Sequence, residues 1–179
     1  NEDPRRLDEA YVKLLGTGGE KVLTDEVKWL AITHKSFDHG RRGFNDRLAF
    51  LGKRIVDLQT SIALLAAPRS VASASQNQID SYGRHSFQHP ALQTLDNLSD
   101  QAKAEAVNKQ RLARLADRYG MDKVIRWKPK KADNLQGSGM DSVLAQTLYA
   151  IVGAIALERG GETAVKVVRE RMLTPMGLV

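Results

Sequence analysis

Histidine and serine side chains are the groups in this chain whose types and spacing suggest acid–base or nucleophilic chemistry. His34 and Ser36 lie two positions apart, and a hydroxyl beside an imidazole is a common way to activate a nucleophile. Residues two apart on a helix do not face each other, so we expect hydrogen bonds to backbone near the following loop instead. His85 and His89 are four apart, but the glycine before them and the proline after them indicate a loop. Neither pair is expected to be a catalytic or metal site.

The amino-acid composition limits the kinds of partner and metal site that this chain could have. The chain has 179 residues, a formal net charge of +6 and no cysteine, which excludes a disulfide framework and any cysteine-ligated metal. A basic balance favours a polyanionic partner, although a solvated positive face is the plain alternative. No apolar run approaches the roughly 18–20 residues of a membrane span, so we expect no membrane-spanning segment.

Apolar residues recur with a helical period along the chain, and no alternating strand pattern is evident. Asn45 is a suitable N-cap for a long helix that Pro68 stops, with an inward face made of Leu48, Leu51, Ile55, Leu58, Ile62 and Leu65. The stretch from Ser142 to Leu157 is apolar nearly all round, which predicts the central buried helix. Residues 69–90 fit a loop, a frayed helix or a segment ordered by a partner. The pattern predicts one all-α domain over residues 1–179.

Three blocks of sequence resemble one family of nucleases. The first is THKS from Thr33 followed by NDRLAFLGKRIVDL from Asn45, the second is VNKQRLARLADRYGM from Val107, and the third is SVLAQTLYAIVGAIALERGG from Ser142. Their order and separation are similar to those of the ribonuclease III family. The resemblance implies an all-α, RNase III endonuclease-like helical domain, here with no double-stranded-RNA-binding domain appended.

The resemblance also locates the family's chemistry, which uses four acidic side chains around magnesium. Magnesium prefers oxygen ligands and serves phosphodiester hydrolysis by activating water and neutralising charge. The corresponding positions here are Ala49, Lys53, Gln146 and Tyr149, none of which carries a carboxylate. Asp46 aligns with a further signature acid, but a carboxylate beside a helix N-terminus has a structural explanation too. We therefore expect no enzyme activity, no metal and no cofactor.

Two properties of the family do not require the acids. Dimerisation through the signature helix would use Phe50, Leu51 and Gly52, with the glycine allowing close approach; these could equally be plain core residues. Contact with the RNA backbone would use phosphate-binding cations, here Arg41, Arg42, Lys53, Arg54, Lys128, Lys130 and Lys131. Solvated loop cations are the alternative reading of that set.

A basic, one-domain chain without the acids looks most like the RNase III-fold proteins of the fungal mitochondrial large ribosomal subunit. That resemblance implies a structural role in the mitochondrial matrix, with ribosomal RNA, other large-subunit proteins and a second RNase III-fold subunit, or a second copy, as partners. One alternative is an inactive subunit of a heterodimeric RNA-processing endonuclease. Another is a residual enzyme that uses Asp46, Asp96 or the histidines.

Overall fold

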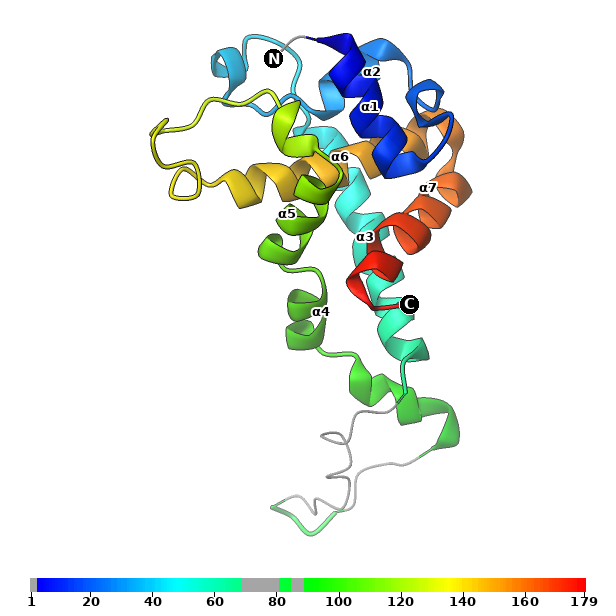
Figure 1. Cartoon of the computed structure of the whole chain (residues 1–179). Helices are drawn as coiled ribbons and strands as arrows, with labels where there is room; N and C mark the ends of the chain where they lie inside the picture. The colour runs from blue at the N-terminus through cyan, green and yellow to red at the C-terminus, as the bar shows by residue number, and fades with distance from the viewer. Residues whose placement is uncertain (1–2, 69–80, 85–88) are drawn as a thin grey trace.

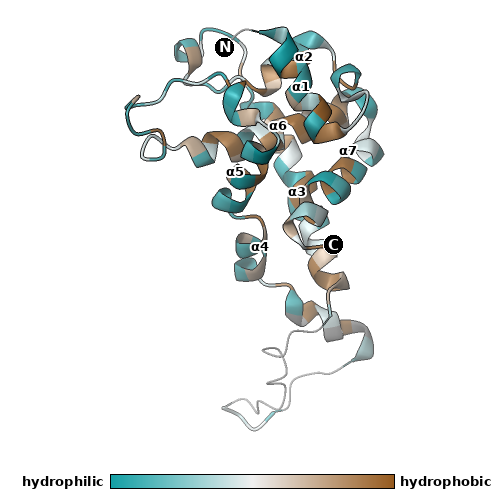
Figure 2. Ribbon diagram, viewed as in Figure 1, coloured by the Kyte–Doolittle hydropathy of each residue, from teal (hydrophilic) through white to brown (hydrophobic). Residues whose placement is uncertain are grey.

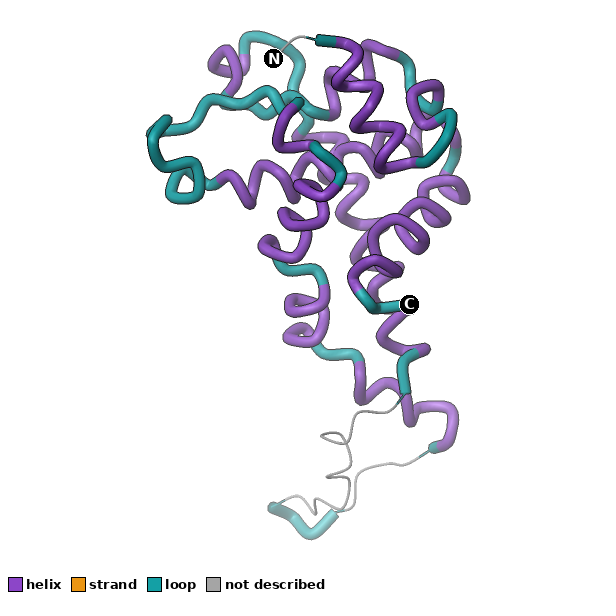
Figure 3. The backbone as a smooth tube through the Cα atoms, viewed as in Figure 1, coloured by secondary structure: helices purple, strands orange, loops and turns teal. Residues whose placement is uncertain are grey.

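A computed structural model of the chain describes residues 3–68, 81–84 and 89–179, which form an all-α fold (Figures 1 and 3). No strand occurs within these ranges, where the nearest feature is a single parallel bridge between Thr33 and Arg126. The predicted fold class is confirmed. The elements in order are α1 (Pro4–Leu15), η1 (Gly19–Lys21), α2 (Asp25–Ala31), η2 (Phe37–Gly40), α3 (Asp46–Ala66), η4 (Pro90–Asn97), α4 (Asp100–Ala106), α5 (Lys109–Arg118), η5 (Met121–Lys123), α6 (Met140–Arg159), α7 (Gly161–Val167), η6 (Val168–Leu173) and η7 (Thr174–Met176).

Helix α6 is the centre of the core, as its all-round apolar sequence predicts (Figure 2). Its buried side chains point in every direction and include Leu144, Leu148, Ile151 and Ile155. By length and hydropathy α6 is also long enough to cross a membrane, contrary to our expectation that no segment reaches that length. Because 61% of its most apolar window is buried inside the fold, core packing accounts for that hydropathy.

Two glycines let α3 and α6 pack backbone to backbone. A Cβ placed on Gly52 would lie 1.8 Å from the backbone oxygen of Tyr149, and one on Gly153 would lie 2.1 Å from the backbone oxygen of Leu48. Real side-chain atoms do not approach this closely, so only glycine fits at either position. The close approach that we expected Gly52 to allow between subunits is therefore made within one chain.

Helix α3 begins and ends where the sequence predicts, but its inward face differs from the predicted one. Leu48 is buried as predicted, but the rest of the buried seam consists mostly of smaller residues, among them Ala49, Gly52, Val56 and Ala63. Leu58 and Ile62, which we expected inside, are 58% and 47% exposed. The reason is the short distance between α3 and α6, which requires glycine where the two backbones touch and favours small side chains beside it.

Candidate nucleic-acid interface

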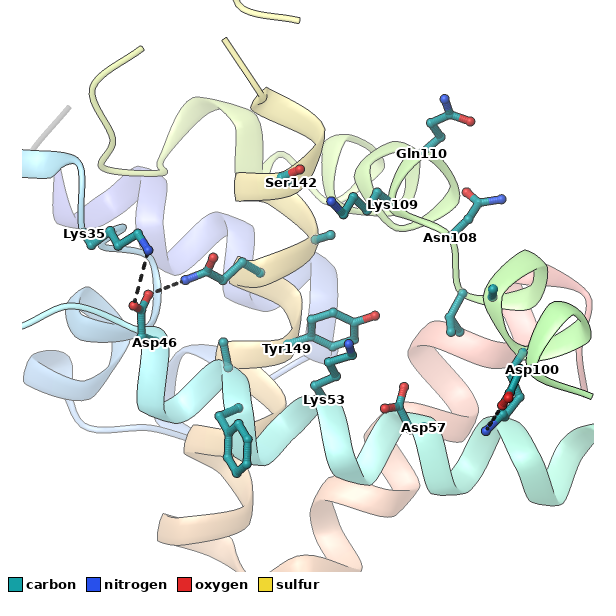
Figure 4. Close-up of a pocket in the computed structure, with 17 residues that line it drawn as sticks. Lys35, Asp46, Lys53, Asp57, Asp100, Asn108, Lys109, Gln110, Ser142 and Tyr149 are labelled. Carbon is teal, nitrogen blue, oxygen red and sulfur yellow. Dashed lines mark hydrogen bonds and ion pairs between the residues drawn. The ribbon is translucent and has the colours of Figure 1, made fainter. Parts of the chain in front are cut away.

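An open cleft of about 1090 Å³ lies between α3 and α6 on one side and α4 with the start of α5 on the other (Figure 4). It contains all four residues that we expect, from the sequence resemblance, at the positions of the family's metal-binding acids, namely Ala49, Lys53, Gln146 and Tyr149. The remaining lining residues are Lys35, Asp46, Phe50, Asp57, Asp100, Lys103, Ala104, Val107, Asn108, Lys109, Gln110, Ser142 and Ala145. The fold thus brings together residues that are up to 114 positions apart, from Lys35 to Tyr149.

The end of the cleft nearest the start of α3 is closed by a hydrogen-bonded bridge between α3 and α6. Gln146 Nε2 donates to Asp46 Oδ1 at 2.7 Å and to Asn45 Oδ1 at 2.9 Å. The orientation of the Gln146 amide follows from its neighbours, because Asn45 Nδ2 already donates to the backbone oxygen of Ala31 and leaves its oxygen to accept. Asn45 therefore occupies the predicted N-cap position but uses its side chain to join α2, α3 and α6.

A divalent cation does not fit the groups at this place. The N–H of Gln146 points at the Asp46 carboxylate, where a metal would need an oxygen ligand, and Lys53 projects an ammonium group into the cleft (Figure 4). Burial, assisted by the charge of Asp57, raises the pKa of Tyr149 to about 12, so its hydroxyl remains protonated near neutral pH. Within the described ranges no group of three or more histidine, aspartate or glutamate side chains could hold a metal ion.

Four lysines and three aspartates are the charged groups that line the cleft. Lys35 lies 3.9 Å from Asp46, and Lys103 lies 3.2 Å from Asp100. Lys53 and Lys109 form no ion pair with any residue that the structure describes. Of these four, the sequence analysis found only Lys53. The others were missed because they lie on three separate segments, although the position of Lys109 directly after the N-cap Asn108 could have drawn attention to it.

The other predicted RNA-binding residues fall into two places. Arg54 is not among the residues that line the cleft; its guanidinium carbon lies 4.9 Å from the ring centre of Phe50, which lines the cleft edge. The two basic loops are tied together, because Lys128 N donates to Ser36 Oγ at 2.9 Å and His34 N donates to the Arg126 oxygen at 2.9 Å. Their predicted cations are exposed or nearly so: Arg41, Arg42, Lys128, Lys130 and Lys131.

His34 and Ser36 contact each other, contrary to our expectation. They lie in a turn and not on a helix, and His34 Nδ1 is 3.0 Å from Ser36 Oγ. The imidazole nitrogen also accepts from Ser36 N, while the hydroxyl accepts from Lys128 N, so both groups hold the backbone of the joined loops. Burial, aided by the charge of Lys35 and opposed by that of Asp46, lowers the pKa of His34. The predicted hydrogen bonding to backbone is confirmed.

Comparison with known proteins identifies the family. The family model described as Ribonuclease-III-like matches residues 24–176. The chain belongs to this ribonuclease-III-like family. It is 44% identical over 177 residues to large ribosomal subunit protein mL57 of Neurospora crassa, covering 99% of this chain and 65% of that protein. It is 27% identical to ribonuclease 3 of Thermobifida fusca over 162 residues, covering 89% of this chain and 57% of that enzyme. The chain thus spans about two thirds or less of these relatives.

Solved structures agree with the fold of this ribonuclease-III-like chain. The crystal structure of the nuclease domain of ribonuclease III from Campylobacter jejuni superposes with a TM-score of 0.61, covering 98% of this chain and 97% of that one. At 22% sequence identity this similarity shows a shared fold and nothing more.

The side chain of Asp96 and the whole of His85, which we considered as candidate site residues, lie outside the described residues.

The ribonuclease-III-like fold leaves an apolar surface on the side of α3 that faces away from α6. Phe50 is 65% exposed there, Leu51 is half-buried, and Gly52 faces the core instead. The helical period adds further residues to Phe50 and Leu51 and defines the α3 stripe: Arg47, Phe50, Leu51, Arg54, Ile55, Leu58 and Ile62. An exposed apolar surface of this kind is typical of a protein interface.

Proposed function

We propose that this protein is a structural constituent of the mitochondrial large ribosomal subunit, which binds ribosomal RNA through a non-catalytic ribonuclease-III-like domain over residues 1–179. The observation that carries the proposal is a cleft in which Lys53 presents an ammonium group and Gln146 donates to Asp46, at positions where the sequence resemblance places the family's metal-binding carboxylates. The 44% identity to a large ribosomal subunit protein supports the ribosome as its location. The mitochondrial matrix follows from the same resemblance.

The charges in the cleft argue against phosphodiester cleavage. An ammonium group about 4 Å from a divalent cation costs roughly 4 kcal/mol for each unit of charge, at an effective dielectric constant of about 20. Gln146 meanwhile donates to Oδ1 of Asp46, and Lys35 lies 3.9 Å from Oδ2, so both carboxylate oxygens already face positive or N–H groups. We therefore infer that the cleft holds RNA by phosphate contact and does not cut it.

The lysines of the cleft and the cations of the joined loops supply such phosphate contacts. Lys53 and Lys109 have no acidic partner among the described residues, so their charges are available to a polyanion. Each phosphate neutralised adds about 0.9 to the slope of log binding constant against log salt. Contacts to the charged phosphates of the RNA backbone recognise the shape of folded RNA and not its sequence, which suits a structural protein.

We further propose that the α3 stripe pairs with another RNase III-fold subunit. The stripe contains Arg47 and Arg54 but no acidic side chain, since Asp46 and Asp57 face the cleft. Two copies of this chain packed stripe to stripe would bring only positive charges together, which is unfavourable. A different subunit with acidic residues opposite the two arginines fits better, so we favour a heterodimer over a homodimer.

Sedimentation of the endogenous protein through a gradient, with and without EDTA, tests the proposal. We expect it to migrate with the large ribosomal subunit in both conditions. A light complex that contains a second, acid-bearing RNase III subunit would instead favour the role of inactive partner in an RNA-processing endonuclease. Migration as a free protein in both conditions would refute both roles.

The pairing is tested separately by substituting the stripe. We expect Leu58→Asp to release the partner subunit on purification, because it places a charge in an apolar contact. Leu157→Asp is the matched control, since Leu157 is 68% exposed on α6 and lies outside the stripe. Equal retention of the partner by both variants would refute the assignment of the α3 stripe as the interface.

A further inference from the structure

Helix α5 carries a row of polar and basic side chains that starts at the cleft. Gln110 lines the cleft, and Arg114 and Arg118 follow it at intervals of four residues, so the three lie on one face of the helix. At 1.5 Å per residue the row is about 12 Å long. The opposite face of α5 is buried through Leu112, Ala113, Leu115 and Ala116, which leaves the row exposed.

Two further cations from distant parts of the chain meet the end of this row. Lys13 Nζ of α1 lies 3.8 Å from where a Cβ of Gly120 would be, immediately after α5. Arg171 of η6 is held beside Tyr119, whose hydroxyl donates to the Arg171 backbone oxygen at 2.8 Å. The Arg171 guanidinium reaches the end of α1, where its Nη2 donates to the Leu15 backbone oxygen at 3.5 Å and lies beside Gly16.

The charges of this group are not neutralised within the chain. Among the described residues, Lys13, Arg114, Arg118 and Arg171 form no ion pair with a carboxylate, including Asp117 on the same helix. Lys13 and Arg118 lie in the last turns of their helices, where a cation stabilises the helix dipole. That explanation does not extend to Arg114, which lies in the middle of α5.

We propose that Arg114, Arg118, Lys13 and Arg171 form a second RNA contact, the α5 ridge, which continues the phosphate path out of the cleft. The ligand is the phosphate backbone of double-stranded RNA, held by charge without reading its sequence. The ridge rests on the proposed function, because its RNA enters from the cleft. It assigns an RNA-binding role to four residues that the motif comparison does not single out.

Salt dependence of binding to a mixed-sequence RNA duplex tests the ridge. The ridge variant carries Arg114→Gln and Arg118→Gln, and the cleft variant carries Lys53→Gln and Lys109→Gln. The control variant removes two exposed lysines elsewhere, Lys21→Gln on η1 and Lys166→Gln on α7. Since each lost phosphate contact lowers the slope by about 0.9, we expect the ridge variant to lose about 1.8 and the control to keep the wild-type slope.

The outcomes separate the ridge from the cleft. A ridge variant with the same slope and affinity as the control would overturn the ridge while leaving the cleft proposal to its own variant. A lowered slope for the ridge variant with an unchanged cleft variant would support the ridge and refute RNA binding in the cleft. Arg114→Lys with Arg118→Lys keeps the charges and should restore the slope, which excludes loss of folding as the cause.

Discussion

Replacing Gly52 with alanine should destabilise the protein strongly, although alanine is the better helix former. The new Cβ would lie 1.8 Å from the Tyr149 backbone oxygen and 2.7 Å from the backbone nitrogen of Gly153. The first distance is about 1.6 Å short of an ordinary 3.4 Å contact, and a backbone atom in the core helix cannot rotate away. Helices α3 and α6 would have to separate, and the Gln146 bridge between them would open.

The expected loss of stability is the difference between two opposing effects of the Gly52→Ala substitution. Alanine in a helix interior gains about 1 kcal/mol over glycine. Overpacking of a core costs about 1–3 kcal/mol and occasionally more, and a clash with rigid backbone belongs at the upper end. We therefore expect the free energy of unfolding to fall by about 2 kcal/mol or more, measured as a lower midpoint in urea with circular dichroism.

Gly161→Ala is the matched control for this experiment. Nothing lies within 4 Å of a Cβ at Gly161, and its backbone is helical at the start of α7. Its stability should stay the same or rise by up to about 1 kcal/mol. A Gly52→Ala protein as stable as the wild type would show that the two backbones are not in contact, and would refute the geometry of the cleft.

Three further predictions concern the cleft and the joined loops. Gln146→Leu should lower the free energy of unfolding by about 1–3 kcal/mol, because the buried oxygen of Asn45 loses its donor; unchanged urea midpoints would contradict the bridge. His34 should contribute stability that is lost as pH falls below about 6.5, because its folded pKa is lowered and the unfolded state then binds more protons. Unfolding of the His34→Gln variant measured from pH 5 to 8 should show a weaker pH dependence than the wild type, and identical slopes would exclude this role. Millimolar magnesium should leave the melting temperature unchanged relative to sodium chloride at equal ionic strength; a magnesium-specific rise that Asp46→Asn abolishes would show that the cleft does hold metal.

The faces of α3 illustrate how far sequence reasoning extends. Its start after Asn45 and its end before Pro68 follow from local rules, since an N-cap and a proline act on the few residues around them. The inward face was predicted wrongly for Leu58 and Ile62 because hydrophobicity alone does not tell a core contact from an exposed apolar stripe. The distance between α3 and α6 decided that, through Gly52 and Gly153.

The cleft shows the same distinction between what local sequence predicts and what three-dimensional packing decides. The sequence by itself determined a helical fold, a central apolar helix and the absence of carboxylates at Ala49, Lys53, Gln146 and Tyr149, where the resemblance predicts the family's acids, because these depend on residue type and order. Only the tertiary structure decided that Gln146 bridges to Asp46, that the cleft gathers lysines from separate segments, and that Arg54 is not part of its lining. Those facts depend on which helix faces are brought together across long sequence separations, and packing in three dimensions sets that arrangement.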